Sequence, residues 1–215
     1  MNIKNHILVG VVLVMLMASS CYTVGVLGFD LGSEFYKIAV ISPGKSLQMV
    51  ENTQSKTKTN TMCSFYDGDR LLEADALVKQ SKKPENSFAA LLKYFGIKDY
   101  ADKELQAAVE RQFDHKNAEN FTLDDYSTIK FKLKDFVLTN IPEDKDYPAK
   151  DRVNKEHTDL LFEEIMAMII ERARTLSDKY GNNEYPDAVY AVPPWWGPVE
   201  REQLASIGEL AGINA

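Results

Sequence analysis

Between residues 24 and 50 the sequence holds three short apolar segments separated by two turns that contain glycine. The segments cover residues 24–30, 36–41 and 47–50, and the turns are Leu31-Gly32 and Pro43-Gly44. Short apolar runs bounded by Gly and Pro predict strands that follow one another in an antiparallel meander. The folded part of this chain is therefore expected to begin with a sheet.

Patterns further along the chain predict both strands and helices. Asp67-Gly68 stands between two strand-like segments and is typical of a tight hairpin. Helical patterns cover residues 73–82, 87–95, 101–113, 154–180 and 199–210, and all but the one at 101–113 are followed within two residues by glycine or proline. A further strand is expected at 187–192. Residues 129–134 alternate apolar and lysine side chains, which indicates a strand with one solvated face rather than a basic binding site.

The charge of the chain limits its ligands. There are 25 basic and 32 acidic residues, a formal net charge of -7, so bulk electrostatics does not favour nucleic acid or an anionic membrane. The two cysteines, Cys21 and Cys63, form neither a disulfide framework nor a zinc-ligand spacing. An anionic ligand must be held locally, by a few well-placed groups.

Residues 1–20 differ in composition from the rest and predict a secretory signal peptide. Residues 7–17 carry no charge, follow Lys4 and precede Ala18-Ser19-Ser20. A membrane anchor is the less favoured alternative, because 11 apolar residues fall short of the roughly 20 that span a bilayer. A lipoprotein attached through Cys21 is another. Entry into the secretory pathway predicts a glycan on Asn120 of the Asn-Phe-Thr sequon.

The candidate site with the clearest chemistry is the turn at residues 29–34. The backbone amides of Gly32, Ser33 and Glu34 can form a nest for phosphate oxygens, and the carboxylate of Asp30 can hold Mg²⁺ through water. A purely structural hairpin is the alternative, since Asp and Gly are common in such turns. Neither a Walker motif nor a G-x-G-x-x-G loop is present.

The second unusual segment is residues 192–201. Trp195 and Trp196 follow a double proline and precede a helix that carries Glu200, Arg201 and Glu202. Adjacent tryptophans can form an aromatic platform for a ligand, but a buried anchor for the strand-to-helix turn is the favoured interpretation.

Three segments occur in an order that resembles a known family. They are Val-Leu-Gly-Phe-Asp-Leu-Gly-Ser at 26–33, Val-Tyr-Ala-Val-Pro-Pro-Trp-Trp-Gly-Pro-Val-Glu-Arg at 189–201, and Ala-Gly-Ile-Asn at 211–214. Together they resemble the nucleotide-binding domain of the heat shock protein 70 chaperones, and in particular their large endoplasmic-reticulum branch. The resemblance covers residues 24–215 and implies an α/β fold, the first lobe of an actin-like (ribonuclease H-like) ATPase with a mixed sheet and flanking helices, truncated before the second phosphate loop.

This resemblance implies roles for individual residues. Those that match the first phosphate loop, and would bind ATP or ADP, are Asp30, Gly32, Ser33, Glu34 and Phe35, with Asp30 in the position that holds Mg²⁺ through water. Pro193 and Arg201 match the proline switch and the arginine that relay the nucleotide state to the partner domain.

Three departures from the family pattern affect this assignment. Asn60 stands where the family usually has the proline of a Thr-Pro turn, and Glu73 replaces a glycine. Leu92 stands where the catalytic lysine belongs, with Lys93 one place later. Leu92 implies slow hydrolysis; if the lysine is instead Lys93, hydrolysis is expected to be normal.

The resemblance implies an ATP-binding chaperone or nucleotide-exchange co-chaperone of the endoplasmic reticulum lumen. Its expected partners are unfolded polypeptides and a partner heat shock protein 70 of the same compartment, with neither nucleic acid nor, after signal cleavage, a membrane. The alternatives are another actin-like ATPase, such as a sugar kinase, and a secreted non-catalytic interaction domain in which Asp30 and the tryptophans are structural.

Overall fold

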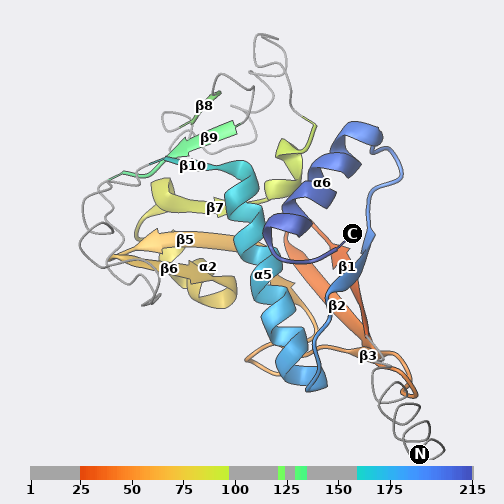
Figure 1. The fold of residues 1–215 in the computed structure, drawn as a ribbon. Coiled ribbons are helices and arrows are strands. Elements are labelled where there is room, and N and C mark those ends of the chain that lie inside the picture. The colour runs from red at the N-terminus through yellow and green to blue at the C-terminus, as the bar shows by residue number, and fades with distance from the viewer. Residues whose placement is uncertain (1–24, 97–120, 124–128, 135–158, 215) are drawn as a thin grey trace, which may run out of the picture.

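The computed structural model describes residues 25–96, 121–123, 129–134 and 159–214. The described segments form three sheets and two longer helices, and helix α5 (Phe162–Gly181) runs between the sheets (Figure 1). The signal peptide predicted for residues 1–20, the sequon residue Asn120 and the helix predicted at 101–113 lie outside the described residues.

The largest sheet contains the predicted meander. Its strands are β1 (Val26–Leu31), β2 (Phe35–Ile41), β3 (Gln48–Met49), β4 (Thr59–Asn60) and β11 (Asp187–Ala191). Strands β1, β2 and β3 are antiparallel neighbours, which confirms the meander, and β4 also pairs with β2. Strand β11 joins β1 in parallel, so the sheet is mixed and unites the two ends of the described chain.

Alternation along β1 and β2 decides which face of this sheet is buried. Leu27, Phe29 and Leu31 on β1 and their counterparts Tyr36, Ile38 and Val40 on β2 are all buried. The residues between them face outward, because successive side chains of a strand point to opposite faces. The outward face therefore carries Asp30 and Lys37.

The second sheet has the order β6-β5-β7, with β5 (Met62–Tyr66), β6 (Asp69–Leu72) and β7 (Ser87–Ala89). The turn between β5 and β6 has positive φ at both Asp67 (52°) and Gly68 (81°), as a two-residue hairpin of the Asp-Gly type requires. Helix α2 (Glu73–Gln80) follows directly. The predicted hairpin and the predicted helix after it are both confirmed.

The third sheet has the order β10-β9-β8, with β8 (Phe121–Leu123), β9 (Ile129–Lys132) and β10 (Asp159–Leu161). As its alternation predicted, β9 buries Ile129 and Phe131 while Lys132 is exposed.

Two long helices cover the sheets. Helix α5 packs against strands of all three sheets and against α6 (Pro198–Leu210). The buried side chains of α5 recur every three or four residues, as on one face of a helix: Phe162, Ile165, Met166, Ile169, Ile170, Ala173, Leu176 and Ser177. Among the described residues, no helix has both the length and the hydropathy to cross a bilayer.

Two helix predictions are wrong in part. Residues 87–95 form strand β7 and a short 3₁₀ helix, η2 (Leu91–Tyr94), because Ser87–Ala89 pair with β5. A second 3₁₀ turn, η1 (Pro84–Asn86), precedes β7. Residues 159–161 pair with β9 instead of starting the long helix. That helix ends at Gly181, and the residue that caps it in the left-handed conformation is Asn182. In each case pairing with a distant strand overrides a local helical pattern.

Aromatic rings connect the second and third sheets to the turn before α6. Consecutive ring centroids lie between 4.6 and 6.1 Å apart along the series Phe65, Phe88, Phe131, Tyr94, Phe162, Phe95 and Trp196. Contacts of this spacing stabilise a core beyond their area burial. The position of Trp196 is therefore coupled by packing to strands far from it in sequence.

Candidate functional site

The turn between β1 and β2 is a tight hairpin anchored at its base. The Gly32 N–H donates to the Phe35 carbonyl at 3.1 Å, which leaves Ser33 and Glu34 at the tip. Thr61 holds the turn from the side: its hydroxyl donates to the Gly32 carbonyl at 3.0 Å, and its N–H donates to the Glu34 carbonyl at 2.9 Å. The loop is thus fixed before any ligand arrives.

Gly32 is required by this geometry. A Cβ at this position would lie 2.5 Å from the Phe35 carbonyl oxygen, well inside van der Waals contact. The sequence places glycine here because the backbone closes on itself, a role that involves no ligand.

The phosphate nest predicted from the sequence is reduced from three amides to two. The Gly32 amide is engaged within the hairpin, whereas in the part of the chain that the structure describes the amides of Ser33 and Glu34 donate to no other group. Both residues are exposed, as is Phe35 beside them. Two adjacent free amides at a rigid tip can receive the oxygens of one anionic group.

Asp30 lies beside this tip and is available to a cation. Its side chain is 59% exposed and accepts a hydrogen bond from Lys37 Nζ at 3.1 Å. No group of three or more acidic, histidine or cysteine side chains that could hold a metal occurs among the described residues. A cation at Asp30 would therefore have one carboxylate and otherwise water, which suits Mg²⁺, an ion that keeps several waters when it binds proteins.

The open face of the sheet forms a shallow groove next to Asp30. The groove has a volume of about 490 Å³, and its lining includes Gly28, Lys37, Ala39 and Val189. The charged groups of Asp30 and Lys37 stand at an otherwise apolar surface.

Glu73, the residue found in place of a glycine, starts α2 with a left-handed backbone, φ 61°. Only glycine adopts this conformation without cost, which explains why the family pattern has a glycine where this chain has Glu73. The Glu73 side chain is nevertheless buried, and its Oε1 accepts hydrogen bonds from Tyr36 Oη and from Arg172 Nε, both at 3.0 Å.

This network connects the base of the hairpin with two helices. Tyr36 follows Phe35 directly, Glu73 begins α2 and Arg172 lies on α5. Burial, followed by the adjacent Glu73 carboxylate, raises the pKa of Tyr36 above its ordinary value, so the phenol stays a donor. The sequence signalled Glu73 only as a departure and did not indicate its partners.

Pro193 and Arg201, the predicted switch residues, meet through the backbone of Trp196. The Trp196 N–H donates to the Pro193 carbonyl at 3.1 Å, and Arg201 Nε donates to the Trp196 carbonyl at 3.1 Å. The Trp196 side chain is buried against Phe95, whereas Trp195 is 80% exposed. The favoured interpretation, a buried anchor, holds for Trp196 but not for Trp195.

Leu92 is partly buried and packs against the hydrophobic core. It belongs to the 3₁₀ helix η2, in which successive residues differ by about 120° rather than the 100° of an α-helix. Lys93 therefore points in a different direction, and the side chain at the aligned position brings no positive charge.

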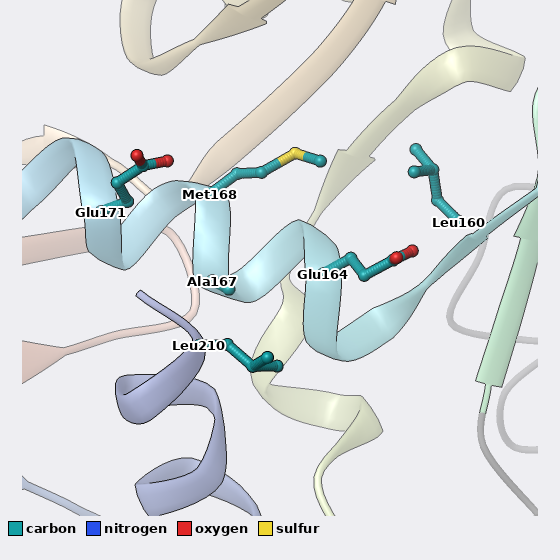
Figure 2. Close-up of a pocket in the computed structure, with 6 residues that line it drawn as sticks. All are labelled: Leu160, Glu164, Ala167, Met168, Glu171 and Leu210. Atoms are coloured by element: carbon teal, nitrogen blue, oxygen red, sulfur yellow. The ribbon is translucent and has the colours of Figure 1, made fainter. Parts of the chain in front are cut away.

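A second concavity, of about 260 Å³, lies between the first half of α5 and the end of α6 (Figure 2). Ala167, Met168 and Leu210 supply apolar lining, and Glu164 and Glu171 add carboxylates. Glu164 already accepts the Leu161 N–H at 2.8 Å, as a cap on the start of α5. This groove lies apart from the hairpin tip and was not indicated by the sequence.

The mixed sheet with its covering helices agrees with the fold of the actin-like ATPases. A family model described as Hsp70 protein matches residues 26–215, and the chain therefore belongs to the heat shock protein 70 family. The expectation of an actin-like α/β fold is confirmed.

Similar proteins include hypoxia up-regulated protein 1 from Xenopus laevis, 26% identical over 93% of this chain and 27% of that protein. The human protein of the same name is 26% identical over 96% of this chain and 18% of its own length. Heat shock protein 88 from Dictyostelium discoideum is 24% identical over 88% of this chain and 21% of its length. The chain thus spans less than a third of each of these relatives.

Proposed function

We propose that the chain supplies the first phosphate loop of an ATP site in a chaperone of the endoplasmic reticulum lumen. The observation that carries this proposal is the rigid hairpin tip, where the free amides of Ser33 and Glu34 stand beside the exposed carboxylate of Asp30. This arrangement offers hydrogen-bond donors to phosphate oxygens and an acceptor to a hydrated cation. It suits a phosphate group with its metal better than a purely structural hairpin, which needs neither.

Mg²⁺ fits the donor set described above. When bound, it would neutralise part of the phosphate charge. Asp30 would hold the ion through water molecules, and the amides of Ser33 and Glu34 would orient the phosphate. The hydrogen bond from the Thr61 hydroxyl to the Gly32 carbonyl would hold the loop in place while the ion and the phosphate bind.

The nucleotide state has two structural connections to the rest of the domain in this proposal. One is the Tyr36–Glu73–Arg172 network at the base of the hairpin. The other is the turn from Pro193 to Trp196, which Arg201 fixes and which contacts the aromatic core.

The family and the relatives named hypoxia up-regulated protein 1 support a proposal for the biological role. We infer an ATP-binding chaperone or nucleotide-exchange co-chaperone that acts on unfolded polypeptides together with a partner heat shock protein 70. Hydrolysis is expected to be slow, because transfer of a phosphoryl group relies on positive charge that Leu92 does not supply. ATP would then act mainly to stabilise the conformation that binds the partner.

The test is nucleotide exchange on a partner heat shock protein 70 from the endoplasmic reticulum, loaded with a fluorescent ADP analogue. The full-length protein should accelerate ADP release in the presence of ATP, and Asp30→Asn should reduce this acceleration. Glu51→Gln is the matched control, since Glu51 is an exposed carboxylate that lies outside strands β1 and β2. No acceleration by the wild type, at any ATP concentration, would contradict the co-chaperone role.

A further inference from the structure

Lys37 places a positive charge at the carboxylate assigned to the metal. Asp30 and Lys37 are directly opposite each other in the antiparallel β1–β2 pair, so their side chains leave the same face of the sheet. Lys37 Nζ lies 3.1 Å from Asp30 Oδ2, and the Lys37 side chain is 40% exposed. The ammonium is therefore close to Asp30 and also accessible to a ligand.

A second lysine stands close to Phe35 at the start of β2. Lys58 Nζ lies 5.9 Å from the centroid of the Phe35 ring, a cation–π contact. The tip carries two carboxylates, those of Asp30 and Glu34, and these alone would repel a phosphate. With Lys37 and Lys58 the local charges cancel, so the lysines make the tip compatible with an anion before any metal binds.

The pair between Lys37 and Asp30 can exchange partners at low cost. Both side chains are substantially exposed, and exposed ion pairs contribute little to stability. The lysine ammonium is a compact charge on a flexible stem, which can turn from the carboxylate to a nearby phosphate oxygen. A divalent cation at Asp30, by contrast, would be repelled by the ammonium beside it.

We propose that Lys37 is a nucleotide-binding residue that contacts phosphate oxygens and competes with Mg²⁺ for Asp30, so that nucleotide binding at this site depends only weakly on Mg²⁺. This inference rests on the proposed function, because it assigns Lys37 to the same ATP site. It adds a specific property of the site, its metal dependence, that the family match does not provide.

The test compares the dissociation constant of a fluorescent ADP analogue in excess Mg²⁺ and in EDTA, for the full-length protein. Lys37→Met should weaken binding in EDTA about tenfold, the loss expected for one charge-assisted hydrogen bond. In Mg²⁺ the same variant should change affinity less, or bind more tightly, because the competing ammonium is gone. The dissociation constant in EDTA divided by that in Mg²⁺ should therefore be about tenfold higher in Lys37→Met than in the wild type.

Two further variants separate the effect of the positive charge at residue 37 from the effect of removing any exposed lysine. Lys37→Arg keeps the charge and should retain most of the binding in EDTA. Lys45→Met is the matched control: Lys45 is exposed and follows the opposite end of β2, so neither constant should change. Thermal unfolding of each variant checks that the fold is intact.

The outcomes distinguish this inference from the proposed function. If the wild type binds ADP and Lys37→Met leaves the ratio of the two constants unchanged, the role of Lys37 is wrong while the ATP site stands. An equal weakening under both conditions also overturns it, since a structural role predicts that result. Failure of the wild type to bind ADP under either condition overturns the proposed function and this inference together.

Discussion

Replacing Arg172 by Met tests whether the buried carboxylate of Glu73 depends on its partner. Removal of one member of a fully buried ion pair costs about 3–5 kcal/mol, because the remaining charge is left without compensation. Arg172 is one-third exposed and Glu73 keeps its bond to Tyr36, so water and the phenol recover part of this loss. We expect the free energy of unfolding to fall by about 2 kcal/mol, close to the value of a hydrogen bond to a charged group.

The substitution Glu73→Gly acts in two opposing ways at the same site. It removes the cost of a left-handed backbone at a residue with a Cβ, about 1–2 kcal/mol, and it also removes two hydrogen bonds. The net change should be small. In the double variant Arg172→Met/Glu73→Gly no buried charge is left unpaired, so the double variant should be more stable than Arg172→Met alone.

Urea unfolding of the chain, followed by the fluorescence of the buried Trp196, measures these free energies. Lys179→Met is the control on the same helix, because Lys179 is exposed, and it should change the free energy by less than about 0.5 kcal/mol. Additive effects of Arg172→Met and Glu73→Gly would refute the network, as would a loss in Arg172→Met no larger than that of the control.

Three further predictions concern single positions, and a fourth concerns residues 21–215 as a whole. Gly32→Ala should lower the free energy of unfolding by about 2 kcal/mol, because the new Cβ would collide with the Phe35 carbonyl oxygen. In Gly28→Ala the new Cβ would lie 3.7 Å from its nearest neighbour, the Ala39 carbonyl oxygen, so the same urea experiment should show a loss of about 1 kcal/mol or less. Burial raises the pKa of the Cys63 thiol to about 12. The free energy of unfolding therefore keeps the full contribution of this thiol below the ordinary thiol pKa and loses it as pH rises toward 12. In a Cys21→Ser background, a thiol reagent at pH 8 should label the chain only after unfolding. Endoglycosidase should increase the gel mobility of the protein from secretory cells, with the shift absent in Asn120→Gln. Calorimetry on residues 21–215 should show ATP binding weaker than micromolar, because a lone exposed loop gains only about 1 kcal/mol per hydrogen bond.

The sequence predicted the elements whose signals are local. Alternation and turn chemistry were enough for the β1–β2–β3 meander and for the Asp67-Gly68 hairpin, since each depends on neighbours a few residues away. The local pattern of residues 87–95 predicted a helix, and this was wrong because Ser87–Ala89 pair with β5, a strand more than 20 residues earlier in the chain. The left-handed backbone of Ala90, φ 53°, gives no sequence signal at all.

The candidate site divides in the same way. The Asp30–Phe35 turn was predicted because its motif is contiguous, but its third amide is used by the hairpin itself, which only the closed geometry reveals. The partners of Glu73 are 37 and 99 residues away, beyond what spacing can indicate. Trp195 and Trp196 are adjacent in sequence, and only packing against Phe95 determines which of them is buried.

The most direct test of the phosphate loop is hydrogen–deuterium exchange on the full-length protein with and without MgADP, with calorimetry in parallel to establish that the nucleotide binds. If the amides of Ser33 and Glu34 receive phosphate oxygens, a peptide that spans residues 30–36 should exchange more slowly in the bound state. A peptide from the exposed turn at Pro43-Gly44 should not change. Nucleotide binding without any slowing in residues 30–36 would contradict the assignment of this hairpin to the ATP site.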